Sequence, residues 1–464
     1  MKLRSAEFQQ ESRRLIKVAL PILLAQIASS GMGVVDTFMA SMIGVTDLAA
    51  IGLGAGIWFP VFILCAFGFL AFSPLVSHAL EKRQHQALRD YFFQGPILAI
   101  PLSLLGMLIL MNPEFILNYM KLEQSLYQLT YDYLIYIAYG IPAITLYFAL
   151  RFYWEGFGNT LPTMWISWFG FLVNIPLNAL FMFGGLGIEA YGAAGAGLAS
   201  ALSMWLMLIV AVLYSVKSSW YQAYIHQAVL SDFRPQKVVL LKITKIGVPI
   251  ALAILFEVSL FTSIALFLGP FGEDVIAGHQ IAMSFTSILF MVPLSLAFAV
   301  SITVGRAFGS NDPQQIKVAI LTGLYFALVI GVFISVLTYV VRFWVVAQYT
   351  QSPSVADIAV TLFLFAALYQ VFDSIQVIVA GMLRGFHDSQ VTMWVTLFSY
   401  WVVGLGIGIS FGYYDWFSEE PLGVYAFWAG IDIGLFIAAI LLSWRLWNRY
   451  QVIFARLEGG RVYD

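Results

Sequence analysis

Twelve long apolar runs, separated by short polar connections, make up most of this chain. They cover roughly residues 15–40, 48–78, 91–111, 128–150, 163–184, 192–215, 241–268, 276–307, 317–340, 357–383, 392–413 and 424–447. An apolar run of about 20 residues can cross a bilayer as a helix. The pattern therefore predicts an all-α membrane protein with twelve transmembrane helices. The longest connection, about 216–240, is too short for a separate soluble domain.

Composition and charge agree with this reading. Hydrophobic residues make up 61% of the 464 residues and charged residues only 10%, which is unlike a soluble domain. The first apolar run is too long for the core of a signal peptide, so we expect it to be a retained helix. Of the 23 Lys and Arg residues, 21 fall on the side of the N terminus, and only Lys121 and Arg342 on the other. The positive-inside rule then predicts that both termini are cytoplasmic.

Several functional classes are disfavoured. The net charge is −2 and no basic block stands out, which argues against nucleic-acid binding. The only cysteine is Cys65, so the chain has neither an internal disulfide nor a thiol metal cluster. No G-x-x-x-x-G-K-[ST] phosphate loop is present, and neither H-E-x-x-H nor G-x-S-x-G occurs. We therefore expect no direct ATP drive, no enzymatic reaction and no cofactor.

The chain is an internal duplication with an offset near 228 residues. IKVALPILLAQI from Ile16 matches TKIGVPIALAIL from Thr244, and SPLVSHAL from Ser73 matches SITVGRAF from Ser301. We predict a six-helix lobe over 1–220, a cytoplasmic linker over 221–240 and a second six-helix lobe over 241–464. Because six is even, both repeats enter the membrane from the same side. The lobes should therefore be related by an axis along the membrane normal, with a central cavity between them. A duplicated bundle without a cavity is the alternative.

Three acids lie deep in apolar runs: Asp36, Glu257 and Asp373. A charge near the bilayer centre costs roughly 2.5–3.5 kcal/mol, so such residues indicate a polar interior and a path for ions. The alternative is a neutral, hydrogen-bonded acid that joins helices. In the repeat alignment Glu257 corresponds to Ser29, and Asp36 corresponds to Ile264. Each half can therefore have its own ion site.

The second half offers a cation site. Tyr369 and Asp373 are four residues apart on one helix, so they share a face, and Glu257 lies on the first helix of the same half. Two neighbouring carboxylates repel each other unless a cation neutralises them, and hard cations prefer oxygen clusters. The residue types fit Na⁺ and H⁺ equally well. Further oxygens nearby in sequence are Ser259, Thr262 and Ser374.

The first half offers a second polar pocket. Asn174 and Asn178 are also four residues apart, and Pro176 between them frees a backbone carbonyl. Both amides could share a pocket with Asp36, although asparagine also commonly joins membrane helices. Asp432 is a further acid, in the last apolar run. We expect it near the wet outer end and assign it no role.

Aromatic residues form 16% of the chain, and there are 15 methionines. Aromatic faces attract cations, and methionine makes adaptable contacts, so both suit loosely specific binding of bulky organic cations. Ordinary packing toward lipid explains most of them equally well.

Six stretches resemble the multidrug and toxic compound extrusion (MATE) family, in its NorM-like branch: GMGVVDTFMA, VNIPLNALF, LFEVSLF, AGHQIA, LYQVFDSIQVIVAGMLRGFHD and SYWVVGLGIG. The resemblance runs from Asp36 to Gly408 and implies two six-helix lobes around a central cavity. It also implies antiport, in which Na⁺ or H⁺ enters as a cationic drug leaves. The family's sites map onto two sets: a cation site at Glu257, Asp373 and Tyr369, and a proton or substrate-coupling site at Asp36, Asn174 and Asn178.

We therefore expect a monomeric antiporter of the bacterial inner membrane that exports cationic drugs. We favour Na⁺ at Glu257 and Asp373, because two carboxylates and a tyrosine oxygen are more ligands than a proton needs. Asp36 with its two asparagines could instead bind a proton. The main alternative is a lipid-linked oligosaccharide flippase of similar architecture, which we expect to line its cavity with Arg or Lys for pyrophosphate. A second alternative is an intramembrane enzyme. It would need a reactive dyad or a metal site, and the sequence pattern indicates neither.

Overall fold

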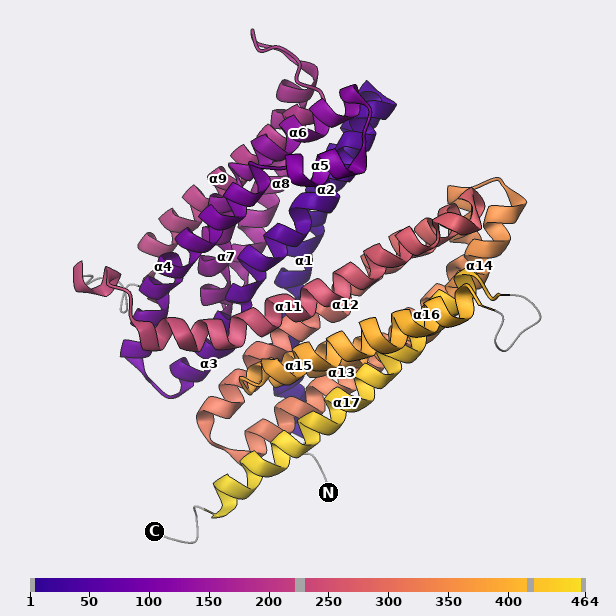
Figure 1. The fold of residues 1–464 in the computed structure, drawn as a ribbon. Helices are drawn as coiled ribbons and strands as arrows, with labels where there is room; N and C mark the ends of the chain where they lie inside the picture. Colours follow the sequence, from indigo (N-terminus) through magenta and orange to yellow (C-terminus); the bar gives the residue numbers. More distant parts are fainter. Residues whose placement is uncertain (1–4, 222–229, 415–420, 460–464) are drawn as a thin grey trace. The chain divides into compact units, whose positions relative to one another are not determined.

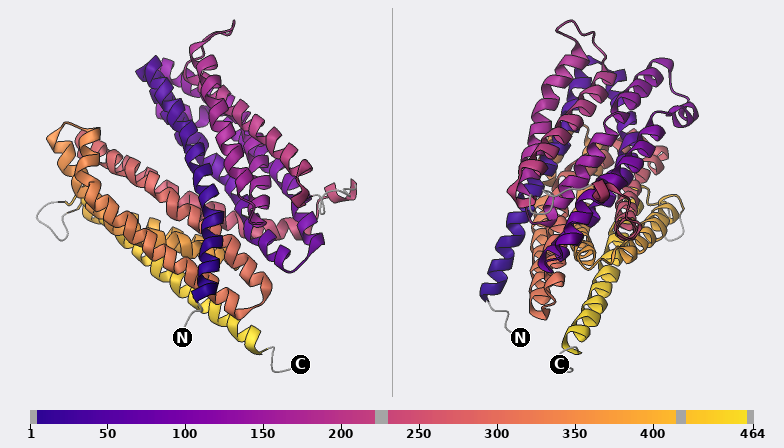
Figure 2. Two further views of the ribbon diagram at one scale, coloured as in Figure 1. Left: turned by 180° about the vertical axis from the view of Figure 1, so that it is seen from behind. Right: turned by 90° about the vertical axis from the view of Figure 1, so that its left-hand side faces the viewer.

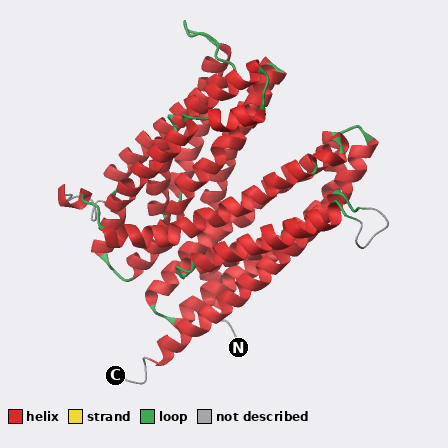
Figure 3. Ribbon diagram, in the orientation of Figure 1, coloured by secondary structure: helices red, strands yellow, loops and turns green. Residues whose placement is uncertain are grey.

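A computed structural model describes residues 5–221, 230–414 and 421–459, and these residues are almost entirely helical (Figures 1 and 3). Among them, the one pairing of extended backbone is an isolated bridge between Gly185 and Ile188. The all-α prediction is therefore confirmed. Lys2, Arg4 and Arg461, which contribute to the predicted orientation, lie outside the described residues.

The described helices include 11 segments that are long and apolar enough to cross a membrane, or 12 if one bent pair counts as a single span. The bent pair is α6 (Gln124–Ala138) and α7 (Ile141–Gly156), which meet at 44°. Gly140 lies at the break and Pro142 in the first turn of α7, where a proline is tolerated but cannot continue a preceding helix. The fourth predicted run, 128–150, is this bent span.

The chain divides into two compact units, each described here by itself. The N lobe comprises Leu20–Ala251, and the C lobe comprises Met1–Ala19 together with Leu252–Asp464. The division falls inside α1 (Ser5–Ile43) and α11 (Lys237–Phe267), close to Pro21 and Pro249, which the repeat aligns with each other.

The N lobe packs around α9. Small residues allow this: a Cβ on Gly197 would lie 2.6 Å from the carbonyl oxygen of Tyr133 on α6, so only glycine permits the approach. The elements of this lobe are α1 from Leu20 onward, α2 (Val45–Ala66), η1 (Phe67–Ala71), α3 (Phe72–Glu81), α4 (His85–Leu110), α5 (Glu114–Met120), α6, α7, α8 (Leu161–Phe183), α9 (Ala193–Lys217), η2 (Leu230–Phe233) and the first part of α11.

The C lobe packs around α14, which contacts α12, α13 and α17. In both views of Figure 2, the start of α1 and the end of α17 lie at the same end of this lobe. The segment η4 is a π-helix inside one continuous span, Ser389–Gly412. The elements of this lobe are α1 up to Ala19, α11 from Leu252 onward, η3 (Gly269–Phe271), α12 (Glu273–Ser310), α13 (Pro313–Tyr349), α14 (Pro353–Gly385), α15 (Ser389–Thr396), η4 (Leu397–Gly404), α16 (Leu405–Gly412) and α17 (Val424–Gly459).

Equivalent helix contacts recur in the two lobes. In the N lobe, a Cβ on Gly156 would lie 2.5 Å from Val76; in the C lobe, a Cβ on Gly385 would lie 2.8 Å from Val304. The two glycines begin the matching stretches GFGNTLPTMW and GFHDSQVTMW, at an offset of 229 residues, and the two valines correspond at an offset of 228. Both copies of the duplicated sequence thus use the same close approach between helices.

Candidate functional site

The N lobe contains a closed hydrogen-bonded cluster around Asp36, whose side chain is 6% exposed. Asn178 Nδ2 donates to Asp36 Oδ1 at 2.5 Å, and Ser200 Oγ donates to Asp36 Oδ2 at 3.1 Å. Asn174 completes the ring, because its Oδ1 accepts from Asn178 Nδ2 at 3.0 Å and its Nδ2 donates to Ser200 Oγ at 3.3 Å. The structure brings together the three residues selected from the sequence and adds Ser200.

Three helices supply this cluster. Asn174 and Asn178 lie one turn apart on α8, which remains helical through Pro176. Asp36 comes from α1 and Ser200 from α9. The cluster therefore does join helices, as the alternative reading proposed. Ser200 escaped the sequence reasoning because a lone serine in AGAGLASALS is typical of close helix packing.

The cluster is rich in acceptors. Each oxygen of Asp36 accepts one of the bonds above, and a carboxylate oxygen can take more than one partner. Asn178 Oδ1 is buried and has no hydrogen-bond partner among the described residues. A proton or a small cation beside Asp36 would complement these oxygens.

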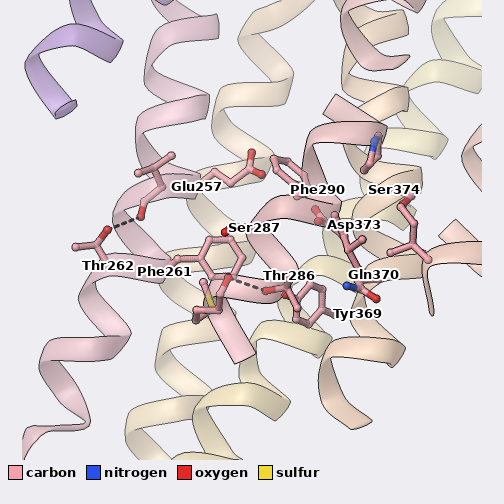
Figure 4. A pocket seen from close by; sticks show the side chains of 15 residues that line it. Glu257, Phe261, Thr262, Thr286, Ser287, Phe290, Tyr369, Gln370, Asp373 and Ser374 are labelled. Carbon is pink, nitrogen blue, oxygen red and sulfur yellow. Dashed lines mark hydrogen bonds between the residues drawn. The ribbon is translucent and has the colours of Figure 1, made fainter. Parts of the chain in front are cut away.

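The C lobe contains a cavity of about 230 Å³ (Figure 4). Its wall is formed by residues of α11, α12, α13 and α14, namely Glu257, Val258, Phe261, Thr262, Met283, Thr286, Ser287, Leu289, Phe290, Pro293, Ile334, Tyr369, Gln370, Asp373 and Ser374. All three residues selected from the sequence for the cation site, Glu257, Tyr369 and Asp373, are in this wall.

The two acids of the cavity come from different helices. Asp373 on α14 is 6% exposed, and Glu257 on α11 is half-buried. In Figure 4 the Glu257 side chain extends from α11 toward Phe290 of α12. The two carboxylates are close enough for their charges to interact. When both are ionised they repel each other, so the cavity favours a positively charged occupant.

Hydrogen bonds hold the surroundings of both acids. Gln376 Nε2 donates to Asp373 Oδ1 at 3.2 Å. Trp401 Nε1, in the π-helical segment η4, donates to the carbonyl oxygen of Phe256 at 3.1 Å and so fixes the turn that carries Glu257. Nothing in the sequence pattern singles out Gln376 or Trp401, because their partners are set by tertiary packing.

The predicted supporting oxygens are only partly in place. Thr262 and Ser374 line the cavity, but Ser259 does not. Ser259 Oγ instead donates to the carbonyl oxygen of Phe256 in its own helix at 3.2 Å. Positions i and i+2 of an α-helix point about 200° apart around its axis. Ser259 is two positions after Glu257, so it cannot share the face of Glu257. The expectation of a wet Asp432 was also wrong, since that side chain is 6% exposed.

The rest of the cavity wall is apolar and aromatic. Phe261, Phe290 and Met283 face the same space as the two acids. Aromatic rings and methionine beside carboxylates suit an organic cation. Pockets for drug-sized ligands span about 300–1,000 Å³, so this cavity suits a small cation or part of an organic one. Its described lining contains no Lys or Arg.

Two arginines counted for the orientation are buried in helices rather than in loops. Arg151 on α7 is 3% exposed and its Nε lies 2.8 Å from Glu155 Oε1. Arg384 on α14 is 5% exposed, and its Nε and Nη2 have no hydrogen-bond partner among the described residues. Arg384 lies close enough to Glu257 for their charges to interact. In the repeat, Arg384 corresponds to Glu155.

Comparisons with known proteins agree with this picture. The model of the MatE family matches residues 21–180 and 249–409, two segments whose starts are 228 residues apart. The chain is 40% identical to the probable multidrug resistance protein NorM of Shewanella oneidensis, with 98% of each chain covered. It is 37% identical to the multidrug resistance protein NorM of Vibrio cholerae, over 95% of this chain and 96% of that one.

Solved structures share the fold. The eukaryotic MATE transporter AtDTX14 superposes with a TM-score of 0.85 at 20% identity, covering 97% of this chain and 100% of that one. A MATE structure in the bent conformation gives a TM-score of 0.86 at 19% identity, covering 99% and 100%. At such identity these likenesses establish the two-lobed architecture.

Proposed function

This chain belongs to the MatE family of multidrug efflux transporters, and from that premise we propose that it is an antiporter, in which Na⁺ or H⁺ moves inward as an organic cation moves outward. The observation that supports this best is the C-lobe cavity, where Glu257 and Asp373 share one space with aromatic and methionine side chains. A small cation and an organic cation would compete there for the same negative charge.

Competition for charge provides the coupling. When the acids are ionised, they attract a cationic drug; when an ion binds them, that attraction is lost. Coupling requires that ion and drug bind two states of the protein with different affinity. One charge moving through 100 mV supplies roughly 2.3 kcal/mol, which is enough to drive export.

We propose Na⁺ as the ion of the C lobe. Glu257 and Asp373 supply carboxylate oxygens, and Tyr369 adds a hydroxyl in the same wall. Oxygen ligands of this kind suit hard cations. Asp36, with its two asparagines, would bind a proton in the N lobe. We further propose a monomer in the bacterial inner membrane with both termini cytoplasmic.

A lipid-linked oligosaccharide flippase is less consistent with the cavity. Its pyrophosphate cargo would require positive side chains, whereas the charged residues in the described lining are Glu257 and Asp373.

The test is efflux of ethidium, an organic cation, from proteoliposomes with separately imposed Na⁺ and H⁺ gradients. Glu257→Gln and Asp373→Asn should each abolish Na⁺-driven efflux while the protein level stays near normal. Asp357→Asn is the matched control, because Asp357 is an exposed acid on the same helix as Asp373, and it should transport normally.

Two outcomes would contradict parts of this proposal. Efflux that survives both cavity substitutions rules out the C-lobe site. Efflux that follows only the H⁺ gradient, and is lost in Asp36→Asn, makes the chain a proton antiporter and overturns the Na⁺ assignment.

A further inference from the structure

Asp432 on α17 is a third buried acid of the C lobe. Its side chain is 6% exposed, and its Oδ1 is buried without a hydrogen-bond partner among the described residues. A buried carboxylate that lacks donors is costly as a free anion, so it must be neutralised by a bound cation or a proton. The surroundings of Asp432 indicate where that charge would lie.

Three ring contacts define the face of α17 that meets α14. In order along both helices, they join Phe365 to Tyr425 at 6.3 Å, Tyr369 to Trp428 at 6.0 Å, and Phe372 to Phe436 at 4.9 Å between ring centroids. Because both series increase in number together, the two helices run in the same direction here.

Asp432 lies on this face. It is four residues after Trp428 and four before Phe436, so helical periodicity places it between them. On α14 this level corresponds to the turn between Tyr369 and Asp373. The Tyr369 hydroxyl is close enough to interact electrostatically with both Asp373 and Asp432. Tyr369 is therefore near both the cavity acid and the additional acid.

Another neighbour of α17 is the π-helical segment η4. A Cβ on Gly434 would lie 2.7 Å from the carbonyl oxygen of Ser399, which shows how closely the two backbones approach. Ser399 Oγ and Tyr400 OH are buried and also have no partner among the described residues. Segments of π-helix frequently occur at functional sites. Unpartnered oxygens thus gather on two elements that pack against each other.

The charged and titratable groups around Asp432 are mostly acidic or phenolic. From α14, Tyr369 interacts with Asp432, and Tyr400 of η4 is close enough to Glu257 and Asp373 to interact with their charges. From α12, His279 reaches this region through its Nδ1, which accepts from Trp428 Nε1 at 3.1 Å. Asp432 itself contributes a single negative charge, which one monovalent cation neutralises.

We infer that Asp432 and Tyr369 form a second small-cation subsite of the C lobe, adjacent to the cavity of Glu257 and Asp373. Tyr369 is shared by the two subsites. The lobe then takes up one monovalent cation more than the two cavity acids alone account for. This inference rests on the proposed function, because it assumes that the cavity acids bind the coupling ion. Na⁺ and a proton are the two possible occupants of the additional subsite.

The test counts bound ions on the purified full-length protein. Equilibrium dialysis with radioactive Na⁺ gives the number of Na⁺ per molecule. Titration in weak buffer from about pH 8 to about pH 6, above the range in which exposed carboxylates titrate, gives the number of protons taken up by the buried acids. Asp432→Asn should bind one Na⁺ fewer than wild type, or take up one proton fewer with its Na⁺ count unchanged. The first result identifies Na⁺ and the second identifies a proton.

Controls separate this inference from the proposed function. Asp357→Asn should match wild type in both counts. If Asp432→Asn matches wild type in both counts, the second subsite is wrong. If Asp373→Asn matches wild type in both counts, the proposed function itself fails, whatever Asp432→Asn shows. Should Asp432→Asn not fold, Tyr369→Phe keeps the ring against Trp428 and removes the shared hydroxyl; unchanged counts in that variant would equally overturn the inference.

Discussion

Asp36, Asp373 and Asp432 are equally buried but differently supported. Asp36 accepts bonds from Asn178 and Ser200, Asp373 accepts one from Gln376, and Asp432 Oδ1 accepts none among the described residues. Hydrogen-bond donors stabilise a buried carboxylate as an anion. The need for a neutralising partner therefore increases from Asp36 to Asp432.

Ser200 is the residue whose loss should disturb the N lobe most specifically. Ser200→Ala removes the hydrogen bonds of Ser200 to Asp36 Oδ2 and Asn174 Nδ2, and an unpaired buried polar group costs about 1–3 kcal/mol. We expect the free energy of unfolding to fall by about that amount in detergent. Ser203→Ala is the control, since Ser203 Oγ donates only within its own helix, to Ala199. Equal destabilisation by both substitutions would contradict a special role for the cluster.

At the scale of elements, the π-helical segment η4 connects two parts of the C lobe. Trp401 binds the backbone of α11 beside Glu257, while Gly404 and Ser399 present carbonyl oxygens to the glycines of α17. A change in the packing of α17 would therefore reach the Glu257 turn through one short segment.

Gly430 tests this contact. A Cβ on Gly430 would collide with the carbonyl oxygen of Gly404, so Gly430→Ala should destabilise the protein by about 1–3 kcal/mol, as overpacking does. Gly406→Ala is the matched control, because a Cβ there meets nothing within 4 Å and alanine favours a helix. Thermal unfolding of both variants should separate them. A Gly430→Ala protein as stable as Gly406→Ala would show that this approach is not tight.

Sequence periodicity was sufficient for the elements and for grouping most of the candidate residues. The apolar runs identify the spans, and helical spacing correctly placed Tyr369 and Asp373 in one wall and Asn174 and Asn178 in one cluster. It failed where the answer depends on which faces of two helices meet. Asp432 is buried because its face of α17 packs on α14, and no pattern within α17 reports that.

At the scale of the molecule, the charge asymmetry predicts the orientation. The charge asymmetry and the even number of predicted spans both place the C-terminal end in the cytoplasm. A fluorescent reporter fused after Asp464 should therefore be active, and an alkaline phosphatase fused there should be inactive. Phosphatase inserted at Lys121, between α5 and α6, should be active as the external control. Phosphatase activity after Asp464 would overturn both the orientation and the even number of spans.

The recurrence of the same close helix contact at Gly156 and Gly385, in lobes that carry unlike acids, has an evolutionary consequence. After the duplication the two copies diverged at these positions: Asp36 has isoleucine at its counterpart, Glu257 has serine, and Arg384 has glutamate. Neither copy retains the polar groups of the other. Doubling either present-day half would therefore lose the polar groups that only the other half carries.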